Sequence, residues 1–246
     1  MALATGGFIA GGAFAQSASW DWQLSEPVQP PDVSIFGTDP DAVTPEMIKQ
    51  LGAAGVYTIC YVSVGTVEKY RDDAGVFPST VIGKTYGDWP DEKFLDIRHL
   101  DILLPIMKAR FERCKAFGFH AVEPDNMDVF DNDSGFPLTR ADGLRYIRAL
   151  AEMAHRLGLG IGQKNVPELT GELVDTLDFV IAESCFQDGW CDEVTAYIRA
   201  GKLILDAEYT DEPINWQGAC ERAQKMGILM ILKDRDLHAG GQSCNE

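Results

Sequence analysis

The sequence predicts an α/β protein that forms one (β/α)8 barrel, a TIM barrel, in a single domain. Short apolar runs alternate with longer helical patterns between residues 20 and 240. This alternation is typical of strand–helix units, in which helices cover a parallel sheet. The chain has 246 residues, a usual length for such a barrel. No glycine-rich phosphate loop follows the first strand, so a doubly wound open sheet has little support.

Eight apolar runs are the candidate strands. We expect strands at 20–24, 33–36, 56–62, 120–123, 160–164, 179–183, 203–208 and 228–232. The runs at 56–62 and 228–232 are apolar at nearly every position. Such runs fit strands that are buried on both faces of a parallel sheet.

Helix signals occupy the intervals between these runs. Thr44 can cap a helix that begins at Pro45, and Thr139 can cap a helix with apolar residues at helical spacing. Glycines stand where we expect helices to end, because glycine readily adopts the left-handed conformation found there. These glycines are Gly52, Gly55, Gly118, Gly158, Gly201 and Gly227.

Residues 1–16 resemble a truncated signal peptide. They are small and apolar without any charge, and Ala13-Phe14-Ala15 fits the small-x-small pattern of a cleavage site, although the usual basic start is missing. The run is too short and too rich in glycine for a membrane span. We therefore expect residues 17–246 to form the mature domain, secreted to the periplasm or the cell exterior, without stable membrane insertion.

Six cysteines behind a signal-like segment suggest disulfides. Cys185 and Cys191 are close in sequence and form the best candidate pair. Cys220 with Cys244 would tie down the C-terminal tail, which leaves Cys60 with Cys114. Six cysteines allow fifteen pairings, and buried free thiols are the alternative.

The formal net charge of −17 at pH 7 excludes some partners. It repels nucleic acids and anionic membrane surfaces and suits a neutral or cationic ligand. The simpler interpretation is an acidic surface that keeps the protein soluble.

Polar residues follow the apolar runs at their carboxyl ends, where barrels carry their active sites. They are Ser63, Glu123, Asp125, Asn126, Lys164, Asn165, Glu183, Glu208, Tyr209, Lys233 and Asp234. Packing alone does not readily explain charged and amide groups at so many strand ends. We expect them to share one rim.

The segment from Glu123 to Asp128 is the densest acidic cluster at a strand end. Paired carboxylates can perform acid–base or nucleophilic work at a glycosidic bond, and oxygen ligands can hold a divalent cation. The segment lacks the regular ligand spacing of a calcium loop, and an Asx-rich turn would also account for part of it.

Glu183 ends an apolar run, where desolvation of its charge is costly unless it faces a polar cleft. Partial burial would raise the pKa of Glu183, as a general acid requires. An ion pair with Lys164 or Lys202 is the structural alternative. Arg98, like Lys164, could hold a carboxylate ionised or bind a sugar hydroxyl.

Aromatic residues near strand ends and loops, among them Trp22, Tyr61, Trp89 and Tyr209, can stack on sugar rings or simply pack in the core. The sequence contains no G-x-S-x-G, H-E-x-x-H or Walker motif, and its four histidines stand apart from any nucleophile pattern. Ser-His and Cys-His hydrolysis therefore have little support.

Several ordered segments between about residues 20 and 210 resemble glycoside hydrolase family 114. They are Trp20-x-Trp22-Gln23-Leu24, Cys60-Tyr61-x-Ser63-x-Gly65, Leu95-Asp96-Ile97-Arg98, Val122-Glu123-Pro124-Asp125-Asn126, Gly135-Phe136-x-Leu138-Thr139, Lys164-Asn165 and Asp178-Phe179…Glu183-x-Cys185. The chain departs from the family pattern at Ala182, at Ser184 and in the apolar segment 33–37. These departures touch neither carboxylate of the implied catalytic pair.

The resemblance implies an endo-α-1,4-polygalactosaminidase activity with retention of anomeric configuration. It also implies that Asp125 and Glu183 are the catalytic pair. By analogy with other α-retaining barrels, Asp125 is expected to be the nucleophile and Glu183 the acid/base. The expected partner is a cationic, galactosamine-rich polysaccharide, and the expected oligomeric state is a monomer. We expect no cofactor and no metal.

The residues expected to bind substrate are Trp22, Tyr61, Asp96, Arg98, Glu123, Asn126, Asp128, Lys164, Asn165, Glu208 and Tyr209. Three alternatives stay open at this point. They are a glycosidase of different sugar specificity on the same scaffold, a non-catalytic carbohydrate-binding barrel, and a metal-dependent hydrolase or deacetylase that uses the 123–128 cluster.

Overall fold

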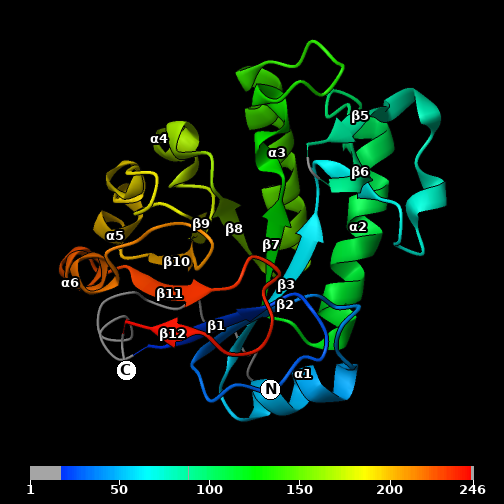
Figure 1. The fold of residues 1–246 in the computed structure, drawn as a ribbon. Coiled ribbons are helices and arrows are strands. Elements are labelled where there is room, and N and C mark those ends of the chain that lie inside the picture. The colour runs from blue at the N-terminus through cyan, green and yellow to red at the C-terminus, as the bar shows by residue number, and fades with distance from the viewer. Residues whose placement is uncertain (1–17, 88, 245–246) are drawn as a thin grey trace.

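The computed structural model of the protein describes residues 18–87 and 89–244, so the expected signal-like segment lies outside the described residues. Its centre is a nine-stranded sheet (Figure 1). In sheet order the strands are β1 (Trp20–Gln23), β2 (Ile35–Thr38), β3 (Tyr57–Ser63), β7 (Ala121–Asp125), β8 (Gly160–Lys164), β9 (Phe179–Glu183), β10 (Leu203–Tyr209), β11 (Leu229–Lys233) and β12 (Gln242–Ser243).

The strands β1 to β11 of this sheet pair in parallel, and β12 pairs antiparallel with β11. Each parallel strand overlaps one of the apolar runs in the sequence, so the predicted barrel is confirmed. Within the described residues, side chains rather than a backbone ladder join β11 to β1. The indole of Trp20 donates to the Leu229 carbonyl at 2.9 Å, and Lys233 pairs with Asp21 at 2.7 Å.

Successive side chains of each strand point alternately into the barrel and outward. The inward side chains form one buried cluster, which includes Ile59 and Phe179. The outward side chains, such as Val122, pack with Phe111 and Leu150 of the surrounding helices in a second and larger cluster. The barrel interior is therefore filled at its base and leaves polar side chains for its mouth.

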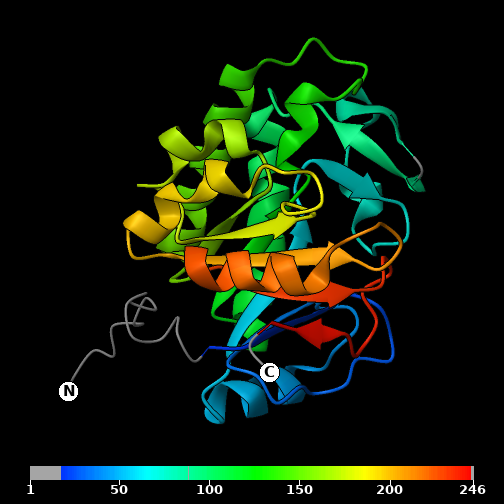
Figure 2. The same ribbon diagram turned by 60° about the vertical axis from the view of Figure 1, so that its left-hand side comes forward.

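Six α-helices surround the sheet in the described part of the chain. They are α1 (Pro45–Ala53), α2 (Leu100–Phe117), α3 (Arg140–Arg156), α4 (Thr170–Leu173), α5 (Ala196–Arg199) and α6 (Trp216–Met226). Figure 2 shows α6 lying across the outer face of β10 and β11. The predicted caps are confirmed, since the Thr44 hydroxyl accepts from the Met47 amide and Thr139 forms a capping box with Asp142.

Two strand–helix units differ from the regular pattern. Residues 24–34, between β1 and β2, form a loop without a helix, and β11 is followed by β12 instead of a helix. Short 3-10 helices take part in several connections: η1 (Ala74–Val76), η2 (Ser79–Val81), η3 (Met127–Asp131), η4 (Pro167–Leu169) and η5 (Cys191–Val194).

A second, antiparallel sheet lies in the connection between β3 and α2 and was not predicted from the sequence. Its strands are β4 (Thr66–Glu68), β5 (Ile82–Tyr86) and β6 (Trp89–Leu95), in the order β4-β6-β5. Figure 1 shows this sheet beside the upper parts of α2 and α3. We refer to β4, β5 and β6 as the insertion sheet.

Three disulfides confirm the expected pairing. Cys60–Cys114 joins β3 to α2, Cys185–Cys191 closes the loop after β9, and Cys220–Cys244 joins α6 to the segment after β12. No described helix combines the length and apolar character that a membrane crossing requires.

Candidate active site

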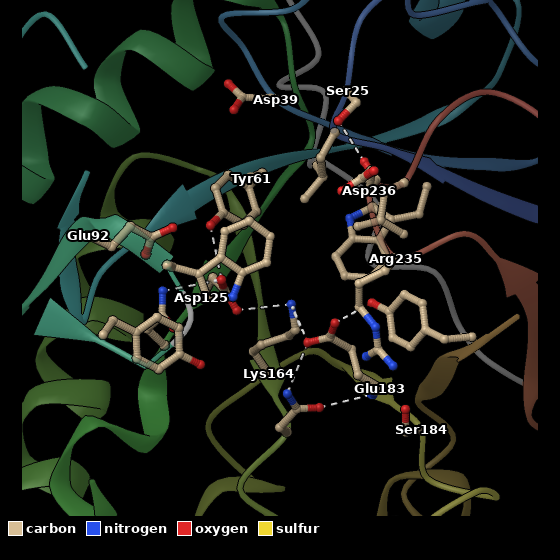
Figure 3. Close-up of a pocket in the computed structure, with 18 of the residues that line it drawn as sticks. Ser25, Asp39, Tyr61, Glu92, Asp125, Lys164, Glu183, Ser184, Arg235 and Asp236 are labelled. Carbon is tan, nitrogen blue, oxygen red and sulfur yellow. Dashed lines mark hydrogen bonds and ion pairs between the residues drawn. The ribbon is translucent and has the colours of Figure 1, made fainter. Parts of the chain in front are cut away.

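A cavity of about 490 Å³ opens at the carboxyl ends of the barrel strands (Figure 3). Its walls come from the ends of β1, β3, β7, β8, β9 and β10, from the insertion sheet, and from the segment after β11. The predicted site residues that line it are Trp22, Tyr61, Asp125, Asn126, Asp128, Lys164, Asn165, Glu183 and Tyr209. The expected rim of polar strand ends therefore exists.

Lys164 lies at the centre of this cavity and contacts three carboxylates. Its Nζ atom is 2.8 Å from Glu123 Oε1, 2.9 Å from Asp125 Oδ1 and 3.1 Å from Glu183 Oε2. Burial alone would lower the pKa of Lys164, but these three carboxylates raise it well above its ordinary value. The side chain is therefore a buried ammonium, which also lies over the Trp22 ring at 4.5 Å.

The strand register explains why these groups meet. Ala121 pairs with Gly160, which brings Asp125, at the end of β7, level with Lys164, at the end of β8. Glu183 ends β9, the next strand of the sheet. Glu123 lies two residues before Asp125 and therefore points to the same face of β7.

The backbone turns sharply directly after each of these strand ends. Asn126, Asn165 and Ser184 follow β7, β8 and β9, and their φ angles are 60°, 50° and 55°. Asparagine tolerates this left-handed region better than most residues, whereas serine gains little there. Such backbone strain is often found at functional sites.

Asp125 is held by hydrogen bonds on the side away from Lys164. The Tyr61 hydroxyl donates to Asp125 Oδ2 at 3.0 Å, and the Asn126 amide donates to the same oxygen at 3.3 Å. The Asp125 side chain is still 20% exposed, so a ligand in the cavity can reach it.

Glu183 accepts hydrogen bonds from two neighbours. The Asn165 amide donates to Oε2 at 3.1 Å, and the Tyr209 hydroxyl donates to Oε1 in a short contact. Burial raises the pKa of Glu183, but Lys164, Tyr209 and Asn165 together outweigh burial and leave it below its ordinary value. The sequence-based expectation of a raised pKa is therefore wrong, and the alternative of an ion pair between Glu183 and Lys164 is confirmed.

Asp125 and Glu183 lie close together because they share one cation. Their nearest oxygens can be no more than about 6 Å apart, since each lies within hydrogen-bond distance of Lys164 Nζ. The Glu183 side chain is 27% exposed. Both carboxylates therefore face the same part of the open cavity.

Glu123 does not line the cavity but supports it from below. It is fully buried, accepts from the Trp22 indole at 2.9 Å and pairs with Lys164. Burial raises the pKa of Glu123 to about 7 despite the nearby ammonium. Its position suits the orientation of Lys164 and Trp22 rather than direct contact with a ligand.

Three other predicted contact residues also lie outside the cavity lining. Glu208 is buried and accepts from the Phe186 and Gln187 amides at 2.7 and 2.9 Å, so it holds the turn after Glu183. Asp96 and Arg98 pair with each other at 2.7 Å.

The insertion sheet supplies residues of the cavity that were not among the predicted substrate contacts. Glu92 and Trp89 on β6 and Tyr86 on β5 line it. Trp89 is 51% exposed, which is unusual for a tryptophan. Trp89 was one of the aromatic residues expected to stack on a sugar or to pack in the core. Because the strands that carry these residues were not recognised, nothing indicated that Tyr86 and Glu92 would reach the barrel mouth.

The acidic segment 123–128 is neutralised by protein groups rather than arranged as an oxygen cage. Glu123 and Asp125 contact the Lys164 ammonium, and Asp128 lines the cavity and accepts from the Asn132 amide at 3.1 Å. Burial raises the pKa of Asp128. The ammonium lies where a cation shared by these carboxylates would have to bind.

A parallel barrel with two neighbouring carboxylates at the mouth of its strands suits the chemistry of a glycoside hydrolase. The sequence profile of glycoside-hydrolase family GH114 matches residues 9–246. The chain therefore belongs to family GH114.

Solved structures agree with this assignment. The crystal structure of Aspergillus fumigatus Ega3 in complex with galactosamine is 28% identical, covers 93% of this chain and 95% of that chain, and superposes with a TM-score of 0.87. The glycoside hydrolase domain of PelA from Pseudomonas aeruginosa is 16% identical, covers 92% and 98% of the two chains, and has a TM-score of 0.70. PelA supports the fold alone.

A sequence relative from Deinococcus radiodurans is described as an uncharacterized protein. It is 24% identical over 213 residues. The match covers 75% of this chain and 66% of that protein.

Proposed function

We propose that the protein is an endo-acting hydrolase that cleaves α-1,4-linked, galactosamine-rich polysaccharide with retention of anomeric configuration. The observation that carries the proposal is the pair Asp125 and Glu183, held on one ammonium in an open cavity. A limit of about 6 Å on their nearest oxygens fits the roughly 5–5.5 Å of retaining glycosidases better than the roughly 6.5–9.5 Å of inverting ones.

In this mechanism Asp125 attacks the anomeric carbon while the glycosidic C–O bond breaks. Glu183 gives its proton to the departing oxygen, and the sugar remains bound to Asp125 as an ester. Glu183 then removes a proton from water, whose oxygen displaces Asp125 from the anomeric carbon. Tyr61 and Asn126 orient Asp125 through their hydrogen bonds.

The choice of sugar is supported by charge and by the comparison with Ega3. A polymer of free galactosamine carries ammonium groups, and the net charge of −17 attracts such a polymer. Ega3, which superposes closely on this chain, was crystallised with galactosamine. Three disulfides support a secreted location, because such bonds persist in oxidising compartments.

Deacetylated α-1,4-polygalactosamine is the substrate for a direct test. Mass spectrometry should detect oligosaccharides, and NMR should show that the first product keeps the α configuration. Asp125→Asn and Glu183→Gln should each lower kcat/KM by about 100- to 10,000-fold. Asp133→Asn is a suitable control, because its side chain is 85% exposed and pairs with Lys84. Wild-type activity in both carboxylate variants would overturn the proposal.

The pH profile of kcat/KM tests the roles of the two carboxylates. The lowered pKa of Glu183 means that this group is ionised in the free protein at neutral pH. If Glu183 is the acid, kcat/KM should fall as the pH rises above that low pKa, which gives an acidic optimum. A kcat/KM that falls only as the pH drops would instead assign Glu183 as the nucleophile.

A further inference from the structure

Glu92 is a carboxyl group of the cavity that the proposed mechanism does not use. It lies on β6 of the insertion sheet, is 9% exposed, and belongs to the cavity lining. Figure 3 shows it beyond Asp125, on the side away from Glu183.

Only one of its two oxygens has a protein partner. The Thr66 hydroxyl donates to Glu92 Oε2 at 2.8 Å, whereas Oε1 has no hydrogen-bond or ion-pair partner among residues 18–87 and 89–244. This oxygen is not one of the fully buried polar atoms without a partner, which are Thr38 Oγ1 and Asp206 Oδ2 among the described residues, so it is accessible from the cavity that Glu92 lines. It is therefore open to a donor group of a bound ligand.

Glu92 lies close to the reaction centre through a short chain of contacts. Thr66 Oγ1 is 3.3 Å from Asn126 Nδ2, and this amide donates to Asp125 Oδ2 at 3.3 Å. Because these contacts are short, Glu92 and Asp125 are within reach of the same sugar or of two adjacent sugars.

The surroundings of Glu92 are acidic and would stabilise a bound positive charge. Burial raises the pKa of Glu92 to about 7, Glu68 and Asp125 act in the same direction, and Arg71 offsets them only in part. Arg71 is already engaged by Glu68, Asp39 and Asp41. The other titratable groups that interact with Glu92 are Tyr61, Tyr70 and Tyr86.

We propose that Glu92 binds the ammonium group of a sugar beside the scissile bond and thereby selects free galactosamine over N-acetylgalactosamine at that position. The inference rests on the proposed function and adds a specificity-determining residue to it. An ammonium would donate a charge-assisted hydrogen bond to the free oxygen. An acetamido group keeps a single neutral N–H donor and adds a bulky acetyl group, so its hydrogen bond to the carboxylate would lack the contribution of charge.

The test uses a partially N-acetylated α-1,4-galactosamine polymer and maps the cleaved positions by mass spectrometry. Glu92→Gln should lower kcat/KM at sites with a free amine roughly tenfold, as expected for the loss of a charged hydrogen bond. Cleavage beside N-acetylated units should not fall. Asp91→Asn is the control, because it removes the same charge from the preceding position, where the side chain is 64% exposed and pairs with Lys69. This variant should change kcat/KM at neither kind of site.

The possible outcomes separate this inference from the proposed function. Cleavage by the wild type with the same site preference in Glu92→Gln and Asp91→Asn overturns the role of Glu92 and leaves the function intact. An equal loss of kcat/KM at both kinds of site would show that Glu92 does not discriminate between the two sugars and would also overturn the inference. If the wild type cleaves no galactosamine polymer, the proposed function itself fails.

Wild-type kinetics provide a second readout that needs no variant. Glu92 is charged above its pKa of about 7 and neutral below it. The KM for the fully deacetylated polymer should therefore rise as the pH falls below 7. A KM that stays constant from pH 7.5 to 5.5 would count against the inference.

Discussion

Lys164 keeps its charge in a place where burial alone would remove it. Three carboxylates at 2.8 to 3.1 Å from Nζ stabilise the ammonium. In return, the ammonium keeps Glu183 ionised and holds it near Asp125. Removing one partner of a buried ion pair leaves the other charge without compensation. This usually destabilises a protein more than replacing the whole ion pair by apolar residues does.

Replacing Lys164 by methionine should therefore affect both stability and catalysis. We expect the free energy of unfolding to fall by about 3 kcal/mol and kcat/KM to fall at least about 100-fold. The pKa of Glu183 should rise, which moves the pH profile of the residual activity upward. Chemical denaturation and pH-dependent kinetics measure these changes. Lys69→Met is the control, because the Lys69 side chain is 81% exposed.

The sequence was sufficient to place the two carboxylates and Lys164 but not to describe their electrostatics. Each of these residues ends an apolar run, and barrel geometry brings neighbouring strand ends together. The pKa of Glu183 depends instead on the distance to Lys164 at the end of β8 and on two further donors, Tyr209 of β10 and Asn165 directly after β8. Such contacts depend on register and rotamer, which an apolar pattern does not specify.

At the level of elements, the parallel strands were predictable and the insertion sheet was not. The barrel strands are buried on both faces, so each leaves a continuous apolar run. The insertion-sheet strands leave no such run: β4 has three residues, and β6 reads WPDEKFL with three exposed residues at its start. Proline and charged residues are depleted in strands, so this segment resembles a loop.

Trp89 offers a test of what the insertion sheet contributes. Its ring is half exposed at the cavity, and aromatic rings there can stack on sugars. Trp89→Ala should raise the KM for long oligosaccharides several-fold, in keeping with about 1 kcal/mol of lost contact, and should leave the melting temperature unchanged. Kinetics with oligosaccharides of increasing length, together with thermal unfolding, measure both effects.

Val76→Ala is the matched control for Trp89→Ala. Val76 is 58% exposed and lies outside the cavity lining. An equal change in KM for the two variants, or a lower melting temperature for Trp89→Ala alone, would contradict a role in substrate binding.

For the molecule as a whole, several buried carboxyl groups make the stability depend on pH. Burial raises the pKa values of Glu123, Asp128, Asp206 and Glu208, and that of Glu123 moves from 4.5 to about 7. The folded chain binds these protons more tightly than the unfolded chain. Their contribution to stability is therefore present at low pH and is lost as the pH rises through the folded pKa values.

Carboxylates with lowered pKa values act in the opposite direction. Asp73 and Asp96, which pair with arginines, stabilise the fold above their ordinary pKa and lose this effect as the pH falls. We therefore expect the free energy of unfolding to peak near pH 5 and to fall by about 3 kcal/mol towards pH 8. Urea denaturation across this range measures the change.

The Asp206→Asn variant should flatten this pH dependence. Asp206 is fully buried beside Glu208, and its pKa is raised well above the ordinary value by burial and by that neighbour. The asparagine side chain has nearly the same shape as that of aspartic acid but does not titrate. A free energy of unfolding that stays level or increases from pH 5 to pH 8 in the wild type would contradict this account.

The contact between the first and last barrel strands determines when the fold can be completed during synthesis. Trp20 bonds to Leu229 and Asp21 to Lys233, over separations of 209 and 212 residues. A nascent chain exposes the open edge of β1 until residues 229–233 have emerged from the ribosome. The barrel therefore closes only after the whole stretch from β1 to β11 has been synthesised, and until then the chain is incompletely folded.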